Sequence, residues 1–115
     1  MDSRFIYKIV PAPLWDDARR AGVFAGAPVD LADGFIHFST AEQVAETAAR
    51  HFAGARDLVL LAVDVNALTA RGLKWEPSRG GALFPHLYAP LPVSAVVWEK
   101  PLVWDGARHI FPELA

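Results

Sequence analysis

The sequence predicts an α+β fold in which two helices lie mainly in the N-terminal half. Strand-like and helix-like segments alternate only in the first half of the chain, and the remainder reads as strands. The sequence therefore predicts five or six strands and two helices. This count disfavours a doubly wound parallel sheet, in which strands and helices alternate throughout. The chain has 115 residues, 53% of them hydrophobic and 21% charged, as expected for one folded domain over residues 1–115.

The N-terminal segment contains one predicted strand and one predicted helix. Residues 5–10 (FIYKIV) are rich in β-branched and aromatic types and end at Pro11, which cannot donate a ladder hydrogen bond. A helix is predicted from Pro13 to about Ala21, because proline fits a first helical turn and apolar residues then recur at helical spacing. The stretch 22–34 has no clear period and is predicted to be a loop.

A short predicted strand at 35–38 leads into the clearest helix start in the sequence. Two S/T-x-x-E/Q pairs occur here, Ser39 with Glu42 and Thr40 with Gln43. In such a capping box, the hydroxyl and the carboxylate or amide bind backbone N–H groups that the helix leaves unpaired. We therefore predict that the second helix begins at this point.

The second half of the chain is dominated by predicted strands. After the second helix, which Gly54 is placed to end, residues 57–65 (DLVLLAVDV) are almost continuously apolar and predict a central strand covered on both faces. The remaining segments are a helical turn at 66–72, a strand at 73–76, a loop at 77–81, an extended segment at 84–91, one or two strands at 93–104 broken at Pro101, and an end at 105–115 that covers an edge.

Composition argues against several functional classes. A net charge of −2 and a pI near 6.0 argue against non-specific nucleic-acid binding. No apolar stretch is long enough for a signal peptide or a membrane span, so we expect a cytoplasmic protein without a membrane partner. Cysteine is absent, which removes thiol catalysis and thiolate metal sites, and no histidine has the i, i+4 partner of a zinc helix. We expect no metal.

His37 lies in a short apolar strand that ends at the predicted helix start. One interpretation is a histidine that is hydrogen-bonded inside the core or at its rim. The other is a ligand-binding junction, because a strand end, the hydroxyls of Ser39 and Thr40 and a helix N-terminus together suit an anion. One of the two hydroxyls suffices as the N-cap, which leaves the second for ligand or solvent.

A second group of candidates flanks the loop 77–81. Trp75 and Glu76 precede this loop, and His86 and Tyr88 follow it at the i, i+2 spacing that places both on one face of an extended segment. Considered one at a time, Trp75 is also explained as a core residue and Glu76 as a surface carboxylate. Together, an aromatic platform, a carboxylate and two polar rings are suited to stacking a planar ring and holding a ribose.

Two cations are further candidates. Lys8 stands in the middle of an apolar strand, where an ammonium group must either reach solvent or face a cavity. Arg79 lies in the loop 77–81 and suits a phosphate or carboxylate, or is a solvated loop charge. The chain has no G-x-x-x-x-G-K-[ST], G-x-G-x-x-G or G-x-S-x-G segment, so P-loop, Rossmann and hydrolase-elbow interpretations lack a motif.

Several segments together resemble the bacterial family called domain of unknown function 952, and the resemblance covers nearly the whole chain. The family's fold is similar to that of ADP-ribosyltransferases, which implies split β-sheets with a cleft between them. GFIHFST is similar to the H-x-H-[LF]-S segment of the RNA 2′-phosphotransferases in that superfamily. The segments are YKI at 7–9, DGFIHFST at 33–40, DLVLLAVD at 57–64, LKWE at 73–76 and FPHLY at 84–88.

The resemblance implies roles for individual residues. His37 and Ser39 match the second histidine and the serine of the phosphotransferase segment, whereas the first histidine has no counterpart. Lys8 falls near the place where the superfamily's first strand offers histidine or arginine to the adenosine side of NAD. Glu76, with Glu99 as a competitor, corresponds to the glutamate that hydrogen-bonds the nicotinamide ribose and stabilises an oxocarbenium-like transition state.

On this resemblance we expect a transferase of ADP-ribosyl or phosphoryl-ribose groups that uses NAD or a related ADP-ribose compound. His37 and Glu76 are the expected catalytic residues, with Tyr88 or Trp75 against nicotinamide. A non-catalytic pocket for a small anionic or nucleotide-like metabolite is the alternative, and a small interaction domain with exposed aromatics is a third. The expected ligand-binding residues are Lys8, Ser39, Thr40, Trp75, Arg79, His86 and Tyr88.

Overall fold

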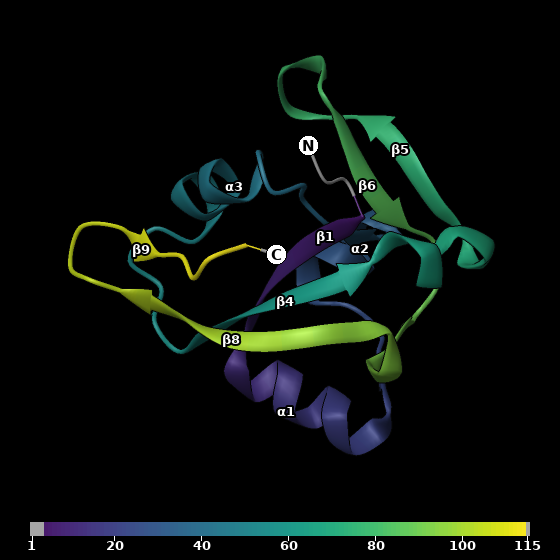
Figure 1. The fold of residues 1–115 in the computed structure, drawn as a ribbon, viewed down its shortest axis with the longest axis horizontal. Coiled ribbons are helices and arrows are strands. Elements are labelled where there is room, and N and C mark those ends of the chain that lie inside the picture. The colour runs from purple at the N-terminus through teal and green to yellow at the C-terminus, as the bar shows by residue number, and fades with distance from the viewer. Residues whose placement is uncertain (1–3, 115) are drawn as a thin grey trace.

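A four-stranded antiparallel sheet lies at the centre of the fold in the computed structural model, which describes residues 4–114 apart from the side chain of Arg79. β4 lies between β1 and β8 and is largely buried, which explains its almost continuous apolar sequence. In spatial order, the strands are β1 (Phe5–Pro11), β4 (Leu58–Asp64), β8 (Val96–Trp104) and β9 (His109–Ile110) (Figure 1).

Two smaller sheets complete the β-structure. The three-stranded sheet has the order β3 (Ile36–His37), β6 (Leu83–Leu87) and β5 (Leu73–Pro77), and the two-stranded sheet pairs β2 (Val23–Phe24) with β7 (Leu91–Pro92). Tyr7 of β1 and Ser39, just after β3, exchange two backbone hydrogen bonds of 2.8 and 2.9 Å. In the described residues, this isolated bridge is the backbone pairing between the central sheet and the three-stranded sheet. Side chains also join the two sheets, since Ile6 and Leu61 share an apolar cluster with Ile36 and Leu87.

Three α-helices accompany the sheets in the described part of the chain: α1 (Ala12–Ala21), α2 (Pro28–Asp33) and α3 (Val44–His51). α1 carries a proline in its first turn and ends at Gly22, whose φ of 82° is a left-handed conformation that glycine adopts without strain. Figure 1 shows α1 and α3 on opposite sides of the central sheet. Short 3₁₀ turns occupy Val65–Ala67, Thr69–Arg71, Arg79–Gly81 and Val93–Ala95.

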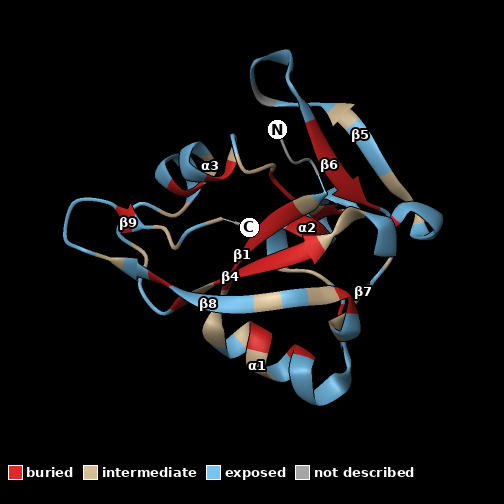
Figure 2. Ribbon diagram, in the orientation of Figure 1, coloured by how far each residue is buried: buried red, intermediate tan, exposed pale blue. Residues whose placement is uncertain are grey.

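Within the central sheet, β1 and β4 are buried on both faces because their alternate residues enter two different apolar clusters, whereas most of β8 is exposed (Figure 2). Ile6 and Val10 face one cluster with Trp15 of α1. Tyr7 faces the other cluster with Val44 of α3. The Cα radius of gyration is 13.2 Å, as expected for a compact domain of this length.

The α+β class is confirmed, and so is the strand–helix order at the N-terminus. The prediction of a loop at 22–34 is wrong, because this stretch contains β2 and α2. α2 has only six residues, too few to show a helical period in the sequence. Its N-terminus is instead stabilised by Asp30, whose Oδ2 accepts a 2.8 Å hydrogen bond from the backbone N–H of Ala27.

The predicted capping box is only partly correct. The backbone N–H of Thr40 donates a 3.0 Å hydrogen bond to Oε1 of Gln43, so the second of the two proposed pairs forms in one direction. The α-helix itself begins later, at Val44, after a turn over 41–43. It ends at His51, before the glycine that was expected to terminate it.

Two strand boundaries also differ from the predictions. The extended segment 84–91 is divided between β6 and β7. In the segment 93–104, a 3₁₀ turn at Val93–Ala95 comes before one strand, β8, that is not broken at Pro101. The N–H and C=O of Tyr7 bond to Ser39, so they point away from β4. Hydrogen-bonded and non-hydrogen-bonded pairs alternate along an antiparallel ladder. Counted from Tyr7 through β4 to β8, Val59 and Pro101 are a pair without hydrogen bonds. The proline nitrogen therefore faces the open edge of β8, where no ladder bond is lost.

Candidate functional site

A cleft of about 980 Å³ lies beside the Tyr7–Ser39 bridge, where the central and three-stranded sheets separate. Its walls come from β1, the segment 37–39, α3, β6 and the start of α2. Four of the residues predicted from the sequence to form a site line this cleft: Lys8, His37, Ser39 and His86.

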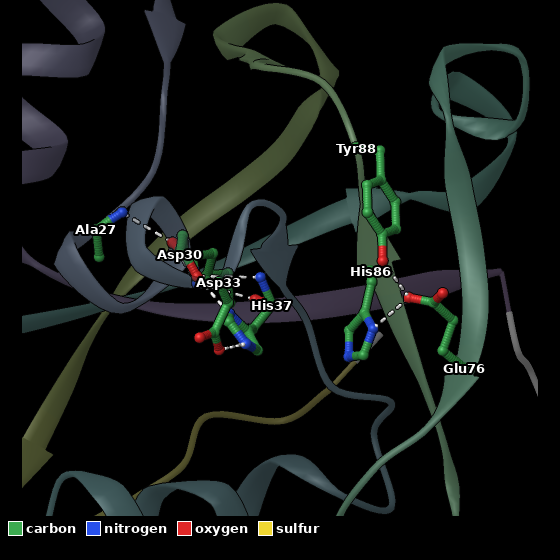
Figure 3. Close-up of polar contacts among 8 residues, drawn as sticks. Ala27, Asp30, Asp33, His37, Glu76, His86 and Tyr88 are labelled. Carbon is green, nitrogen blue, oxygen red and sulfur yellow. Dashed lines mark hydrogen bonds and ion pairs between the residues drawn. The ribbon is translucent and has the colours of Figure 1, made fainter.

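His86 is held by a carboxylate from the neighbouring strand. β5 and β6 pair so that Glu76 is opposite Phe84 and Lys74 is opposite His86, which places all four side chains on the same face. Nδ1 of His86 lies 2.8 Å from Oε1 of Glu76, and the hydroxyl of Tyr88 donates to the same oxygen at 2.8 Å (Figure 3).

These contacts determine the charge of the glutamate and the orientation of the imidazole. The hydrogen bonds from His86 and Tyr88 lower the pKa of Glu76 and outweigh its partial burial, and the same bond raises the pKa of Tyr88. An ionised carboxylate only accepts hydrogen bonds, so Nδ1 of His86 carries a hydrogen. In the neutral ring, Nε2 then has a free lone pair, and no side chain in the described part of the chain occupies it.

His37 has carboxylates at both of its ring nitrogens. Nδ1 lies 2.7 Å from Oδ1 of Asp30, and Nε2 lies 3.0 Å from Oδ2 of Asp33 (Figure 3). Both carboxylates belong to α2, whereas His37 belongs to β3. His37 therefore fastens the short helix to the three-stranded sheet, and each ring nitrogen is already engaged.

Asp30 is the centre of a buried polar network. Its carboxylate accepts from the backbone N–H groups of Ala27 and His37 and forms an ion pair of 3.2 Å with Nζ of Lys8, which also donates to the carbonyl oxygen of His37 at 2.8 Å. Burial raises the pKa of Asp30, but the bonds from His37, the charge of Lys8 and the backbone donors together lower it to about 2. Burial lowers the pKa of Lys8, against the attraction of Asp30.

Phe35 contacts both His37, with its two aspartates, and His86, with its glutamate. Its ring stacks on His86, with centroids 4.1 Å apart and an interplanar angle of 26°, and it also lies 4.5 Å from His37 and 5.2 Å from Tyr88. The two imidazoles are opposite each other on paired strands, with ring centroids 5.5 Å apart. The three rings therefore form one aromatic layer between the two carboxylate groups.

Ser39 lines the cleft but already has a partner, and the remaining predicted residues lie elsewhere. The hydroxyl of Ser39 is 2.9 Å from that of Thr47, so it is not a spare donor, and Thr40 is outside the cleft lining. Trp75 lies on the opposite face of β5 from Glu76 and is 41% exposed, so these two neighbours do not form one platform. Glu99 is on β8 with Arg19 of α1 at 3.6 Å, away from both histidines, and the predicted side chain of Arg79 lies outside the described residues.

Asp30 and Asp33 are the residues that the sequence interpretation missed. The available signal was local: a proline at Pro28 followed by an acid two positions later is a typical first helical turn. In residues 4–114, no three histidine, aspartate or glutamate side chains are grouped so as to hold a metal ion. None of the helices in this part of the chain is long and apolar enough to cross a membrane.

Comparisons with known proteins agree with the family indicated by the sequence. The model of the family described as "Protein of unknown function (DUF952)" matches residues 9–99. The crystal structure of protein CC0527 from Caulobacter crescentus is 54% identical, with a TM-score of 0.87 over 91% of this chain and 91% of that one. The solution NMR structure of CC0527 is also 54% identical, with a TM-score of 0.82 over 92% of this chain and 90% of that one. No curated protein matches the chain.

Proposed function

We propose that this protein, which belongs to the DUF952 family, is an enzyme that binds a small anionic or nucleotide-like molecule in the cleft and uses His86 as a general base. One observation carries the proposal: Glu76 holds Nδ1 of His86, so the basic nitrogen Nε2 is the one left for a ligand. A carboxylate that orients an imidazole in this way is the arrangement by which histidine accepts protons from hydroxyl groups.

In this proposal the chemistry is transfer of a group to a hydroxyl, such as that of a ribose: the hydroxyl oxygen bonds to the transferred group as its bond to the leaving group breaks, and the leaving group departs with that electron pair. Nε2 of His86 removes the hydroxyl proton, and Glu76 stabilises the imidazolium that results. Tyr88 holds the carboxylate in place through the same oxygen that binds the imidazole. Glu76 thus acts through His86 instead of contacting the sugar, and His86 takes the catalytic position first assigned to His37.

An ADP-ribosyltransferase-like fold with NAD or ADP-ribose as the ligand is the more specific form of this proposal. Two antiparallel sheets that are bridged through the backbone at Tyr7 and Ser39, with a cleft beside the bridge, support it. A volume of about 980 Å³ is large enough for a dinucleotide. Phe84 and His86 on one wall would contact its planar rings.

The proposal is tested by measuring binding and turnover in the same preparations. We expect NAD or ADP-ribose to bind in calorimetry and His86→Gln to lower turnover about 100-fold or more while leaving affinity nearly unchanged. Glu76→Gln should lower turnover by a smaller factor, because an amide still accepts from Nδ1 but stabilises the imidazolium less. Glu42→Gln, an exposed change outside the cleft, is the control. No binding at millimolar ligand, or full turnover by His86→Gln, overturns the proposal.

A non-catalytic pocket is the second candidate, and the state of His37 and Ser39 favours it. Both ring nitrogens of the histidine and the hydroxyl of the serine already have protein partners, which leaves few groups for chemistry. This candidate predicts that a ligand raises the melting temperature by binding the native state, with no product formed by the unaltered protein.

A further inference from the structure

Most of the cleft surface away from the two histidines is apolar. Val29 of α2 is 57% exposed although it lines the cleft, so this wall presents hydrocarbon to whatever enters. Leu14 and Phe52 are half-buried in the same lining, and Ile9 and Val44 lie at its base on β1 and α3. Such a surface favours a ligand with an apolar or aromatic body, because exposed hydrocarbon is stabilised when it is removed from water.

Lys8 and Arg50 both line the cleft, but they differ in whether their N–H groups are left for a ligand. Lys8 is buried and its ammonium is engaged by Asp30 and the carbonyl of His37. Arg50, in the last turn of α3, is exposed; its Nε donates to Oε2 of Glu46 at 2.9 Å. The terminal nitrogens of Arg50 have no partner in the described part of the chain, so their N–H groups remain for an anion.

We propose that the natural ligand is an amphipathic molecule: an apolar or aromatic body between α2 and α3, with a single carboxylate, sulfonate or phosphate group at Arg50. The assignment rests on the cleft of the proposed function but not on proton transfer at His86. It competes with the NAD and ADP-ribose form of that function, because both of those ligands carry two charged phosphates. The side chains of Val29, Leu14 and Phe52 offer the rest of the ligand hydrocarbon contacts and no hydrogen-bond donor. One anionic end and one apolar body match the lining residues.

Two fluorescent probes that share one aromatic skeleton test the proposal. 8-Anilinonaphthalene-1-sulfonate carries an anionic group, and N-phenyl-1-naphthylamine is the same skeleton without it. We expect Arg50→Gln to raise the Kd of the sulfonate about tenfold, since a charge-assisted hydrogen bond is lost, and to leave the Kd of the neutral probe within about a factor of two. The control is Arg56→Gln, a change of the same kind at an exposed arginine outside the cleft, which should alter neither Kd.

Backbone NMR shifts during the titration show where the probes bind and whether the variants stay folded. Shifts centred on β1, α2 and α3 support the proposal. Shifts centred on Trp75 and Leu83, which are exposed on the outer face of the β5–β6 hairpin, overturn it. Equal weakening of both probes by Arg50→Gln, or no weakening of either, also overturns it.

The ligand class and the catalytic proposal can fail separately. If NAD and ADP-ribose do not bind but the sulfonate depends on Arg50 as expected, the nucleotide form of the proposed function is wrong and the amphipathic class stands. If a substrate turns over through His86 and Arg50→Gln changes neither its KM nor sulfonate binding, the catalytic proposal stands and the amphipathic class is wrong.

Discussion

The two histidines of the cleft have the same kinds of neighbours but differ in how many of their ring nitrogens are bound. Both lie on paired strands of one sheet, both contact Phe35, and both have a carboxylate at Nδ1. His37 has a second carboxylate at Nε2, whereas Nε2 of His86 has no side-chain partner in the described part of the chain. A carboxylate at one ring nitrogen orients the imidazole and leaves the other nitrogen open, while carboxylates at both nitrogens make the imidazole a structural connection.

The carboxylates also differ in how deeply they lie. Asp30 is 2% exposed and is bound to Lys8 and to two backbone N–H groups, so its charge is part of the folded core. Glu76 keeps about a third of its side chain exposed and binds two side chains that are themselves on the face of a hairpin. Loss of the first should therefore affect folding, and loss of the second should affect the imidazole.

The largest effect is expected from removing Asp30. Asp30→Ala leaves the ammonium of Lys8 buried without its counter-charge and two backbone N–H groups without an acceptor, so the free energy of unfolding should fall by about 3–5 kcal/mol. Urea denaturation followed by circular dichroism measures this loss. Asp33→Ala, which removes the exposed carboxylate of the same helix, should cost under about 1 kcal/mol. Equal losses would contradict the difference in depth.

A smaller effect is expected from acid. The pKa of Asp30 is lowered from 3.8 to about 2 in the folded protein, so the unfolded state takes up its proton first as the pH falls. This carboxylate thus stabilises the fold fully above about pH 4, and that contribution, about 2 kcal/mol, is lost between about pH 4 and pH 2. Urea titrations across this range measure it. Asp30→Asn should show a correspondingly flatter acid dependence, and an unchanged slope would disprove the assignment.

The smallest effect is expected at Phe35, the ring that contacts both histidines. Phe35→Leu keeps apolar volume but removes the stack on His86 and the contact with His37, so stability should fall by about 1 kcal/mol. The imidazole NMR signals of both histidines should move together. Phe111→Leu, at a partly buried phenylalanine of the other apolar cluster, is the matched control and should leave both signals in place. Movement of one histidine alone would show that the ring does not connect the clusters.

The parts of the site that could be predicted are those whose signal is local. Alternation along β6 predicted that His86 and Tyr88 share a face, and both indeed reach Glu76 across the neighbouring strand. Trp75 and Glu76 were grouped because they are adjacent, but adjacent strand residues point to opposite faces, so that grouping was wrong. The prediction that a hydroxyl of Ser39 or Thr40 caps the helix was also wrong, since α3 begins after Gln43 without a side-chain cap and the Ser39 hydroxyl pairs with Thr47 instead.

The sequence by itself determined the α+β class, the buried central strand at Leu58–Asp64 and the family, because apolar runs, turn residues and short motifs are properties of neighbouring positions. Only the tertiary structure decided the roles of the histidines. Asp30 reaches His37 through a helix too short to show a period, and Glu76 reaches His86 through a strand register, so neither pairing is a property of nearby positions alone. A histidine's chemistry depends on what contacts each ring nitrogen, and those contacts exist only once the chain has folded.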